Sequence, residues 1–364
     1  MKPHIILVYT IEIIISRKRK GQIEKMRKEA AADLWKMLYD LTDELKELKP
    51  WEDLWDMDLI GIQENGREEP VFCSIMGRNG DCFGIGLYDG TQGLASFQKS
   101  AAAQDSVQPV DYIMMNQQAL ICYWGDRIDV PEDQKAMIKQ LGRKYRGKNN
   151  WPFFLSFQPR FAPWTPDEEE VRLLVETFVQ LIEGIKALRE ERVKVNFEEG
   201  EFCFRYFDLQ QMNWMTAPAR LPYIEEAYET IEVTDEVLMK RLEKQPENGA
   251  TLLLDTAYLH GMLKDEKFDR PVNPMVLLAV DRESGMILHV KLLSPEEEEG
   301  MAAANFLVNY IEADGRPEKV LARNPYILYA LDEICEKLSI TLNEAPIQEI
   351  DIIMEGMRKQ TGNL

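Results

Sequence analysis

Residues 274–293 read PMVLLAVDRESGMILHVKLL, and this stretch decides the fold class of the second half of the chain. Two apolar runs, 274–280 and 286–293, flank the polar sequence Asp281-Arg282-Glu283-Ser284-Gly285. Short runs of Val, Leu and Ile on either side of a glycine-containing turn are typical of a β-hairpin. We therefore predict two antiparallel strands here, joined at Ser284-Gly285.

The sequence on both sides of this hairpin predicts a mixed sheet covered by helices. A third strand is expected before it at 250–256. After it, helices and strands alternate, with helices at 295–313, 325–338 and 346–359 and strands at 318–323 and 339–343. Hairpin-connected strands followed by such alternation specify a mixed sheet. A strand at 201–209 and a helix at 235–244 complete an expected second domain over 195–364.

The sequence of the first half of the chain predicts a domain over residues 26–190, with a mainly antiparallel sheet and helices. A helix ends at Pro50, and the turn sequences Glu64-Asn65-Gly66 and 77–81 separate short β-rich runs. The clearest helix is expected to begin at Pro166, a residue that favours the first helical position, and to have an acidic first turn. We expect Thr165 to cap it. The other expected elements are strands at 57–63, 70–76, 82–88 and 118–124, helices at 91–103 and from Pro131 to about Tyr145, and a proline- and aromatic-rich loop at 151–166.

Length, charge and cysteine content restrict the class of protein. A chain of 364 residues suits two domains, and its net charge is −20. Such an acidic chain repels nucleic acids and anionic membranes, so we expect neither as a partner. The five cysteines form no CxxC pair and only three histidines accompany them. This pattern predicts free thiols and a cytoplasmic location, with no zinc site.

Residues 1–25 differ from the rest of the chain. They carry six basic and two acidic groups, and an apolar run at 5–15 precedes Arg17-Lys18-Arg19-Lys20. The run is too short to span a membrane, and Glu12 interrupts it. Our hypothesis is that translation starts at Met26 and that residues 1–25 are an extension; a short strand or an anchor touching a membrane is the alternative.

Several motifs resemble an uncharacterised bacterial protein family. The resemblance covers about residues 26–190, and its members carry a second domain like residues 250–360. It implies no activity. The motifs that carry it are Trp51, Trp55, 58–62, 74–77, 88–90, Gly93-Leu94, Trp151-Pro152, Pro159 and Pro163-Trp164.

A second, topological resemblance concerns residues 250–343, which are similar to the ribonuclease H-like core of transposases and integrases. Asp255, the hairpin 281–285 and Gly315-Arg316-Pro317 carry it. In that fold, acids on neighbouring strands hold two divalent ions for phosphodiester chemistry. Asp255 matches the first acid, and a helix acid such as Glu349 or Asp351 would supply the third.

Arg323 stands where the second acid of that fold belongs. A guanidinium at the position of a metal ligand repels the cation, so we expect this domain to be catalytically inert and the chain to bind no cofactor. The alternative is a metal-dependent phosphodiester-processing enzyme with Asp255 and Glu349 as metal ligands.

The basic residues Lys139 and Arg143, followed by the aromatic residues Trp151 and Trp164, form the candidate binding site of the sequence. Cations beside aromatic rings suit an acidic partner, which is either another protein or the C-terminal half of this chain, or single-stranded nucleic acid. The structural alternative is a helix C-terminus with favourable charges, followed by aromatic side chains that fill the core. We expect a non-enzymatic interaction protein whose partner the sequence does not identify.

Overall fold

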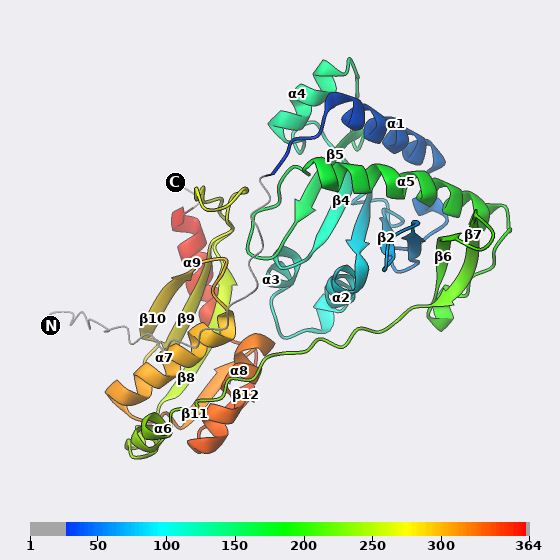
Figure 1. Ribbon diagram of the computed structural model, residues 1–364. Helices are drawn as coiled ribbons and strands as arrows, with labels where there is room; N and C mark the ends of the chain where they lie inside the picture. The colour runs from blue at the N-terminus through cyan, green and yellow to red at the C-terminus, as the bar shows by residue number, and fades with distance from the viewer. Residues whose placement is uncertain (1–26, 362–364) are drawn as a thin grey trace. The chain divides into compact units, whose positions relative to one another are not determined.

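The computed structural model describes residues 27–361 and divides them into two compact units (Figure 1). The first unit comprises residues 27–226 and 262–273. Among the described residues, the second comprises 227–261 and 274–361. Each unit contains one mixed sheet with helices, which confirms the predicted α+β class. No helix in the described part of the chain has the length and apolar character needed to cross a membrane.

The first unit is built on a seven-stranded sheet of order β5-β4-β3-β2-β1-β6-β7. Its neighbouring strands are antiparallel except β1 and β6, which are parallel. The strands are β1 (Ile60–Gln63), β2 (Val71–Met76), β3 (Gly84–Asp89), β4 (Ala119–Gly125), β5 (Trp151–Phe157), β6 (Glu201–Asp208) and β7 (Asn213–Arg220). The helices are α1 (Ala32–Leu48), α2 (Gly90–Ala101), α3 (Val110–Met115), α4 (Glu132–Gln140) and α5 (Glu168–Arg189).

Both faces of this sheet bury apolar side chains. Leu38 of α1 and Phe178 of α5 pack with Ile60 on one face. Leu94 and Phe97 of α2 pack with residues of the opposite face. The two cores explain why the strands of the first unit carry nearly continuous apolar runs.

Helix α5 starts with a capping box. The Asp167 carboxylate accepts the Glu170 N–H (2.9 Å), and the Glu170 carboxylate accepts the Asp167 N–H (2.8 Å). Each side chain satisfies an amide that the first helical turn leaves without a partner. The cap is therefore Asp167, two residues later than the predicted Thr165.

Four predictions about the first half differ from the structure. The stretch 151–166, expected as a loop, contains β5. The stretch after residue 209, where Pro218 and Pro222 predict a loop, contains β7. Because β6 and β7 join the first sheet, the first unit continues to Glu226 instead of ending near residue 190. Helix α4 ends at Gln140 because Gly142 has a φ of 69°, a left-handed conformation that terminates helices.

The second unit is built on a five-stranded sheet of order β10-β9-β8-β11-β12. Strands β8, β9 and β10 are antiparallel neighbours, whereas β11 runs parallel to both β8 and β12. Its strands are β8 (Thr251–Tyr258), β9 (Met275–Asp281), β10 (Ile287–Leu293), β11 (Lys319–Ala322) and β12 (Thr341–Glu344), and its helices are α6 (Glu236–Glu243), α7 (Glu299–Asp314), α8 (Pro325–Lys337) and α9 (Gln348–Thr361). The predicted order of elements from residue 250 onward is confirmed.

One face of this second sheet is covered by α9. Ile350 and Met354 pack with Leu253 of β8 and Leu278 of β9. Helices α7 and α8 pack against each other at Gly300 of α7, where a Cβ atom would lie 2.6 Å from the Cβ of Ala330. A larger residue at Gly300 would force these two helices apart.

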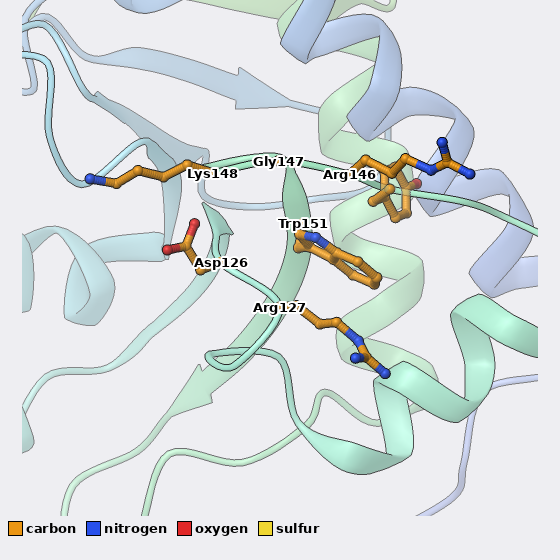
Figure 2. Close-up of a pocket in the computed structure, with 7 residues that line it drawn as sticks. Asp126, Arg127, Arg146, Gly147, Lys148 and Trp151 are labelled. Carbon is orange, nitrogen blue, oxygen red and sulfur yellow. The ribbon is translucent and has the colours of Figure 1, made fainter.

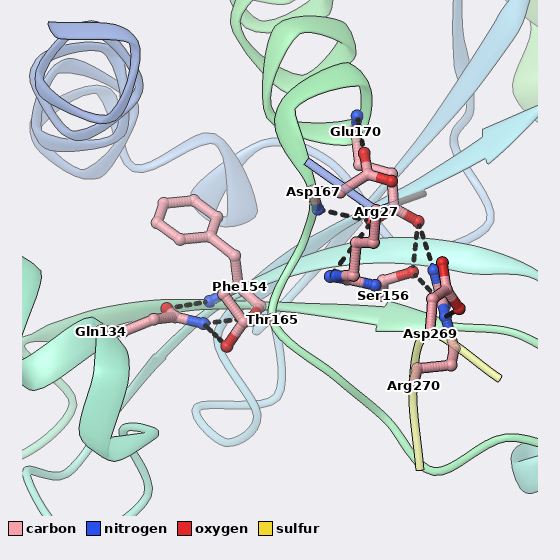
Figure 3. Close-up of polar contacts among 9 residues, drawn as sticks. All are labelled: Arg27, Gln134, Phe154, Ser156, Thr165, Asp167, Glu170, Asp269 and Arg270. Atoms are coloured by element: carbon pink, nitrogen blue, oxygen red, sulfur yellow. Dashed lines mark hydrogen bonds and ion pairs between the residues drawn. The ribbon is translucent and has the colours of Figure 1, made fainter. Parts of the chain in front are cut away.

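Residues 262–273, which connect β8 to β9, belong to the first unit. The Ala162 amide donates to the Pro271 carbonyl at 2.9 Å. The buried Arg270 side chain donates to Ser156 Oγ at 3.1 Å and lies 3.4 Å from Glu170 (Figure 3). This connection therefore adds a buried cation to the capping box of α5.

The predictions for residues 1–25, including the start at Met26, lie outside the described residues. Cysteines 73, 122, 203 and 335 are buried, Cys82 is exposed, and all five are free thiols. Burial raises the pKa of each of the four buried thiols. They therefore stay protonated and are poor nucleophiles.

Candidate functional site

One region of the first unit has a charge opposite to that of the chain as a whole. Residues 134–166 contain seven Lys and Arg residues and no Asp or Glu, although the whole chain has 63 acids and 43 bases. Within this region, residues 141–150 connect α4 to β5. We call residues 141–150 the basic loop.

Both ends of the basic loop are held against the rest of the first unit by polar contacts. Near its start, the Arg143 guanidinium forms ion pairs with Asp40 and Asp43 of α1. Near its end, the Asn149 carbonyl accepts a hydrogen bond from Lys46 Nζ at 2.6 Å, and the Asn149 amide donates to Asp126 Oδ1 at 2.9 Å. The chain between these anchors is therefore held in place without regular secondary structure.

Helix α4 is attached to β5 by a side-chain amide. Gln134 Nε2 donates to the Phe154 carbonyl at 2.7 Å, and the Phe154 amide donates to Gln134 Oε1 at 2.9 Å (Figure 3). The side chain thus substitutes for a neighbouring strand at the edge of the sheet. It positions both elements that flank the basic loop.

A shallow pocket of about 480 Å³ opens where the basic loop meets the ends of β4 and β5 (Figure 2). We call it the Trp151 pocket. In Figure 2 the Trp151 ring lies between Arg127 on one side and Arg146 on the other, while Lys148 points away on the side of Asp126. The lining residues are Asp126, Arg127, Tyr145, Arg146, Gly147, Lys148 and Trp151.

The aromatic part of this pocket consists of two rings and a guanidinium. The Trp151 and Tyr145 ring centroids lie 6.0 Å apart at an interplanar angle of 60°. The Arg127 Cζ atom lies 5.8 Å from the Trp151 ring centroid, within the range of a cation–π contact. Trp151 is half-buried, so part of its ring is available to a ligand.

The cations around the Trp151 pocket are exposed and have no ion-pair partner among residues 27–361. This holds for Arg127, Arg146 and Lys148 in the lining, and for Lys139 and Lys144 nearby. By contrast, a second pocket beside Gly66 contains Arg67 already paired with Asp89, together with Glu68 and Glu69. Of these two pockets, only the Trp151 pocket therefore carries unpaired positive charge.

The structure places the four binding residues that the sequence predicts at different locations. Trp151 lines the pocket, and Lys139 is exposed on α4 outside its lining. Arg143 is occupied by its ion pairs with α1 and serves to position the loop. Trp164 forms a bridge with Ser156 near the other end of β5. Sequence reasoning missed Arg127 and Tyr145, because only the pairing of Gly125 with Trp151 brings the end of β4 to this site.

The second unit contains a buried charged cluster at the carboxyl ends of β8 and β11. Arg323 Nε donates to Asp255 Oδ2 at 2.6 Å, and its two Nη atoms donate to Asp351 at 3.0 and 2.6 Å. The parallel register pairs Lys319 with Thr251, and its continuation places Arg323 beside Asp255. A guanidinium thus occupies the space between the two carboxylates.

The opposite face of the same two strand ends carries a second polar cluster. Asn324 Nδ2 donates to Thr256 Oγ1 at 2.7 Å and to Glu299 Oε2 at 2.6 Å. Thr256 also hydrogen-bonds to Glu299, and all three residues are buried. Four adjacent acids, Glu296–Glu299, predict a solvated helix start. This prediction is wrong for Glu299, because α7 begins at this residue and its carboxylate accepts hydrogen bonds from Asn324 and Thr256 inside the fold.

Asp255 and Glu349, the two metal ligands of the alternative interpretation, do not form a common site. Glu349 lies 3.5 Å from Arg282 in a partly exposed ion pair, and Asp351 takes the place beside Asp255 and Arg323. The residues that the structure describes contain no group of three or more His, Cys, Asp or Glu side chains arranged to hold a metal ion. Burial raises the pKa of Asp255 to about 6, against the opposing effect of the Arg323 charge.

These features define a two-domain α+β protein with a buried, charge-paired cluster in one domain and an open basic pocket in the other. The comparison with family models matches both parts. Residues 35–205 match a model described as Domain of unknown function (DUF7309), and residues 238–358 match one described as Domain of unknown function (DUF6930). This confirms the predicted resemblance to uncharacterised domains in both halves. The comparison with curated proteins gave no match.

Proposed function

We propose that this chain is a cytoplasmic, non-enzymatic interaction protein that binds an acidic protein partner through the basic loop and the Trp151 pocket. The observation that carries the proposal is the group of exposed, unpaired cations at Arg127, Lys139, Lys144, Arg146 and Lys148. Five unpaired cations repel one another, and an acidic ligand relieves that repulsion. Charge complementarity of this kind favours encounter with the correct partner and discriminates against others.

Direct titration with an acidic probe tests the proposal. We expect the full chain to bind fluorescein-labelled deca-glutamate in an anisotropy experiment, with an affinity that falls as salt is raised. A triple variant, Lys139→Glu, Lys144→Glu and Lys148→Glu, should weaken binding by at least about tenfold, since like charges then face the probe.

The matched control changes the net charge of the chain by the same amount at other positions. Lys194→Glu, Lys244→Glu and Lys264→Glu replace three exposed lysines that belong neither to the pocket lining nor to the basic loop. This variant should retain most of the wild-type affinity. Equal losses of affinity in the two triple variants would show that only the net charge of the chain matters, and would contradict the proposal.

A metal-dependent phosphodiester-processing enzyme of ribonuclease H-like fold is the second candidate. It is favoured by the strand order of the second sheet and by two carboxylates, Asp255 and Asp351, that converge at the ends of parallel strands. It is disfavoured by Arg323, which already forms ion pairs with both carboxylates. If this candidate is right, magnesium or manganese should raise the melting temperature of the wild type and not of Asp255→Asn, by mass action.

A further inference from the structure

The Trp151 pocket combines features that select more than negative charge. An acidic probe needs only cations, and the basic loop offers these along its exposed side. The pocket adds the tilted pair of rings Trp151 and Tyr145, with Arg127 over the indole. A flat apolar group of a ligand fits such a surface, because a ring can contact the indole and the guanidinium at the same time.

The cations lie on both sides of this aromatic surface. Figure 2 shows Arg127 and Arg146 on either side of the Trp151 ring, and Lys148 on the far side toward Asp126. A ligand with one ring seated at Trp151 would therefore place its neighbouring groups near positive charge in both directions. Carboxylates suit the two guanidinium groups, which can bind them through two parallel hydrogen bonds.

The pocket is already formed before any ligand arrives. Lys46 and Asp126 hold Asn149, and the ion pairs of Arg143 hold the start of the basic loop. Little ordering of the chain between residues 143 and 149 is then needed on binding. A pre-organised site loses less entropy and binds a short ligand more tightly.

The positive surface is too short for a long polyanion. Asp129, Glu132 and Asp133 are exposed just beyond Arg127, at the start of α4. They would repel a phosphodiester backbone that extended past the pocket. The chain's own acidic stretch around Tyr228 is engaged elsewhere, because that ring stacks on Tyr329 at 4.9 Å and contacts Tyr326 at 5.2 Å.

We propose that the Trp151 pocket recognises a short peptide segment of another protein in which carboxylates flank an aromatic side chain. This inference rests on the proposed function and specifies the partner sequence that the same site selects. The ring of the peptide contacts Trp151 and Arg127. The flanking carboxylates pair with Arg146 and Lys148 or with Arg127.

Two labelled peptides of equal length and charge test this inference on the full chain: Glu-Glu-Tyr-Glu-Glu and Glu-Glu-Ala-Glu-Glu. We expect the tyrosine peptide to bind the wild type about three- to tenfold more tightly, the range expected for one aromatic contact. Trp151→Ala should abolish that difference, so that both peptides bind this variant equally. Trp151→Phe, which keeps a ring at this position, should retain most of the difference.

Trp55→Ala is the matched control, since Trp55 is an exposed tryptophan that also contacts an arginine, Arg78, at 4.7 Å. It should leave both affinities as they are in the wild type. A tyrosine preference that survives in Trp151→Ala, with the fold of that variant verified by circular dichroism, would overturn the inference.

The outcomes separate this inference from the proposed function. Equal binding of both peptides to the wild type overturns the inference and leaves an acidic partner in place. Binding of neither peptide overturns both. Tighter binding of labelled oligothymidylate than of either peptide, lost in Trp151→Ala, would overturn both in favour of nucleic acid.

Discussion

Arg323 is surrounded by acceptors: it donates to Asp255 on one side and to Asp351 on the other. The side chains of Arg323 and Asp255 are only 4% and 2% exposed, whereas that of Asp351 is 48% exposed. Buried ions are stable only when they are paired, and a buried pair contributes little net stability over apolar residues of similar size. The Arg323 guanidinium therefore balances the charge of Asp255 inside the fold.

Removal of Arg323 alone should be costly. We expect Arg323→Met to lower the free energy of unfolding by about 3–5 kcal/mol, because it leaves Asp255 buried without a counter-charge. The double variant Asp255→Leu with Arg323→Met should recover most of this loss. Urea unfolding measures both, and a double variant no more stable than the single one would contradict this description of the cluster.

The raised pKa of Asp255 predicts a pH-dependent stability. A carboxyl that binds its proton more tightly in the folded state stabilises that state below its unfolded pKa, about 4 for aspartate. This stability is lost as the pH rises toward the folded value of about 6. Between these values, the wild type should lose about 1–3 kcal/mol relative to Asp255→Asn. A stability difference between the two proteins that is constant from pH 4 to pH 7 would contradict the raised pKa.

At the scale of elements, the site depends on how α4 and β5 are joined. The Gln134 side chain forms hydrogen bonds with both the backbone amide and the carbonyl of Phe154. Gln134→Leu leaves these two buried groups without partners, and we expect a loss of about 2–3 kcal/mol in the free energy of unfolding. Gln140→Leu, at the exposed end of the same helix, is the control and should change it by less than about 0.5 kcal/mol. Similar effects of the two variants would show that the amide bridge has no structural role.

The elements that the sequence failed to predict share one physical feature. Strands β5 and β7 contain Pro152 and Pro218, and they are the two edges of the seven-stranded sheet. Proline has no backbone N–H to donate to a neighbouring strand, so it is tolerated in edge strands, and it makes such strands resemble loops. Strands without proline between clear turn sequences, such as β2 and β9, could be predicted from their residues alone.

The same feature limited the prediction of the site. Trp151 could be named from sequence, because it follows a run of basic residues. Arg127 joins it only through the pairing of β4 with β5, which the expected loop at 151–166 concealed. In the second unit, Asp255 and Arg323 could be brought together from the order of the strands. The choice of Asp351 over Glu349 depends on which face of α9 packs on the sheet, with Ile350 and Met354 buried.

At the scale of the whole molecule, the chain has a net charge of −20 and, within residues 27–361, a cluster of unpaired cations around the Trp151 pocket. We expect such an acidic surface to disfavour nonspecific binding of nucleic acids and anionic membranes. An acidic partner is likewise repelled by most of this surface. Among residues 27–361, the unpaired cations of the basic loop and the Trp151 pocket favour its approach, so we expect specificity to arise from where these cations lie.

Lysine acetylation in the presence and absence of deca-glutamate, mapped by mass spectrometry on the full chain, tests this claim most directly. We predict that the probe protects Lys139, Lys144 and Lys148, while labelling of Lys194, Lys244 and Lys264 stays the same. All six lysines are exposed, so each reports contact with the probe and not burial in the fold. Unchanged labelling of the first three, or equal protection of both sets, would contradict a binding site at the basic loop.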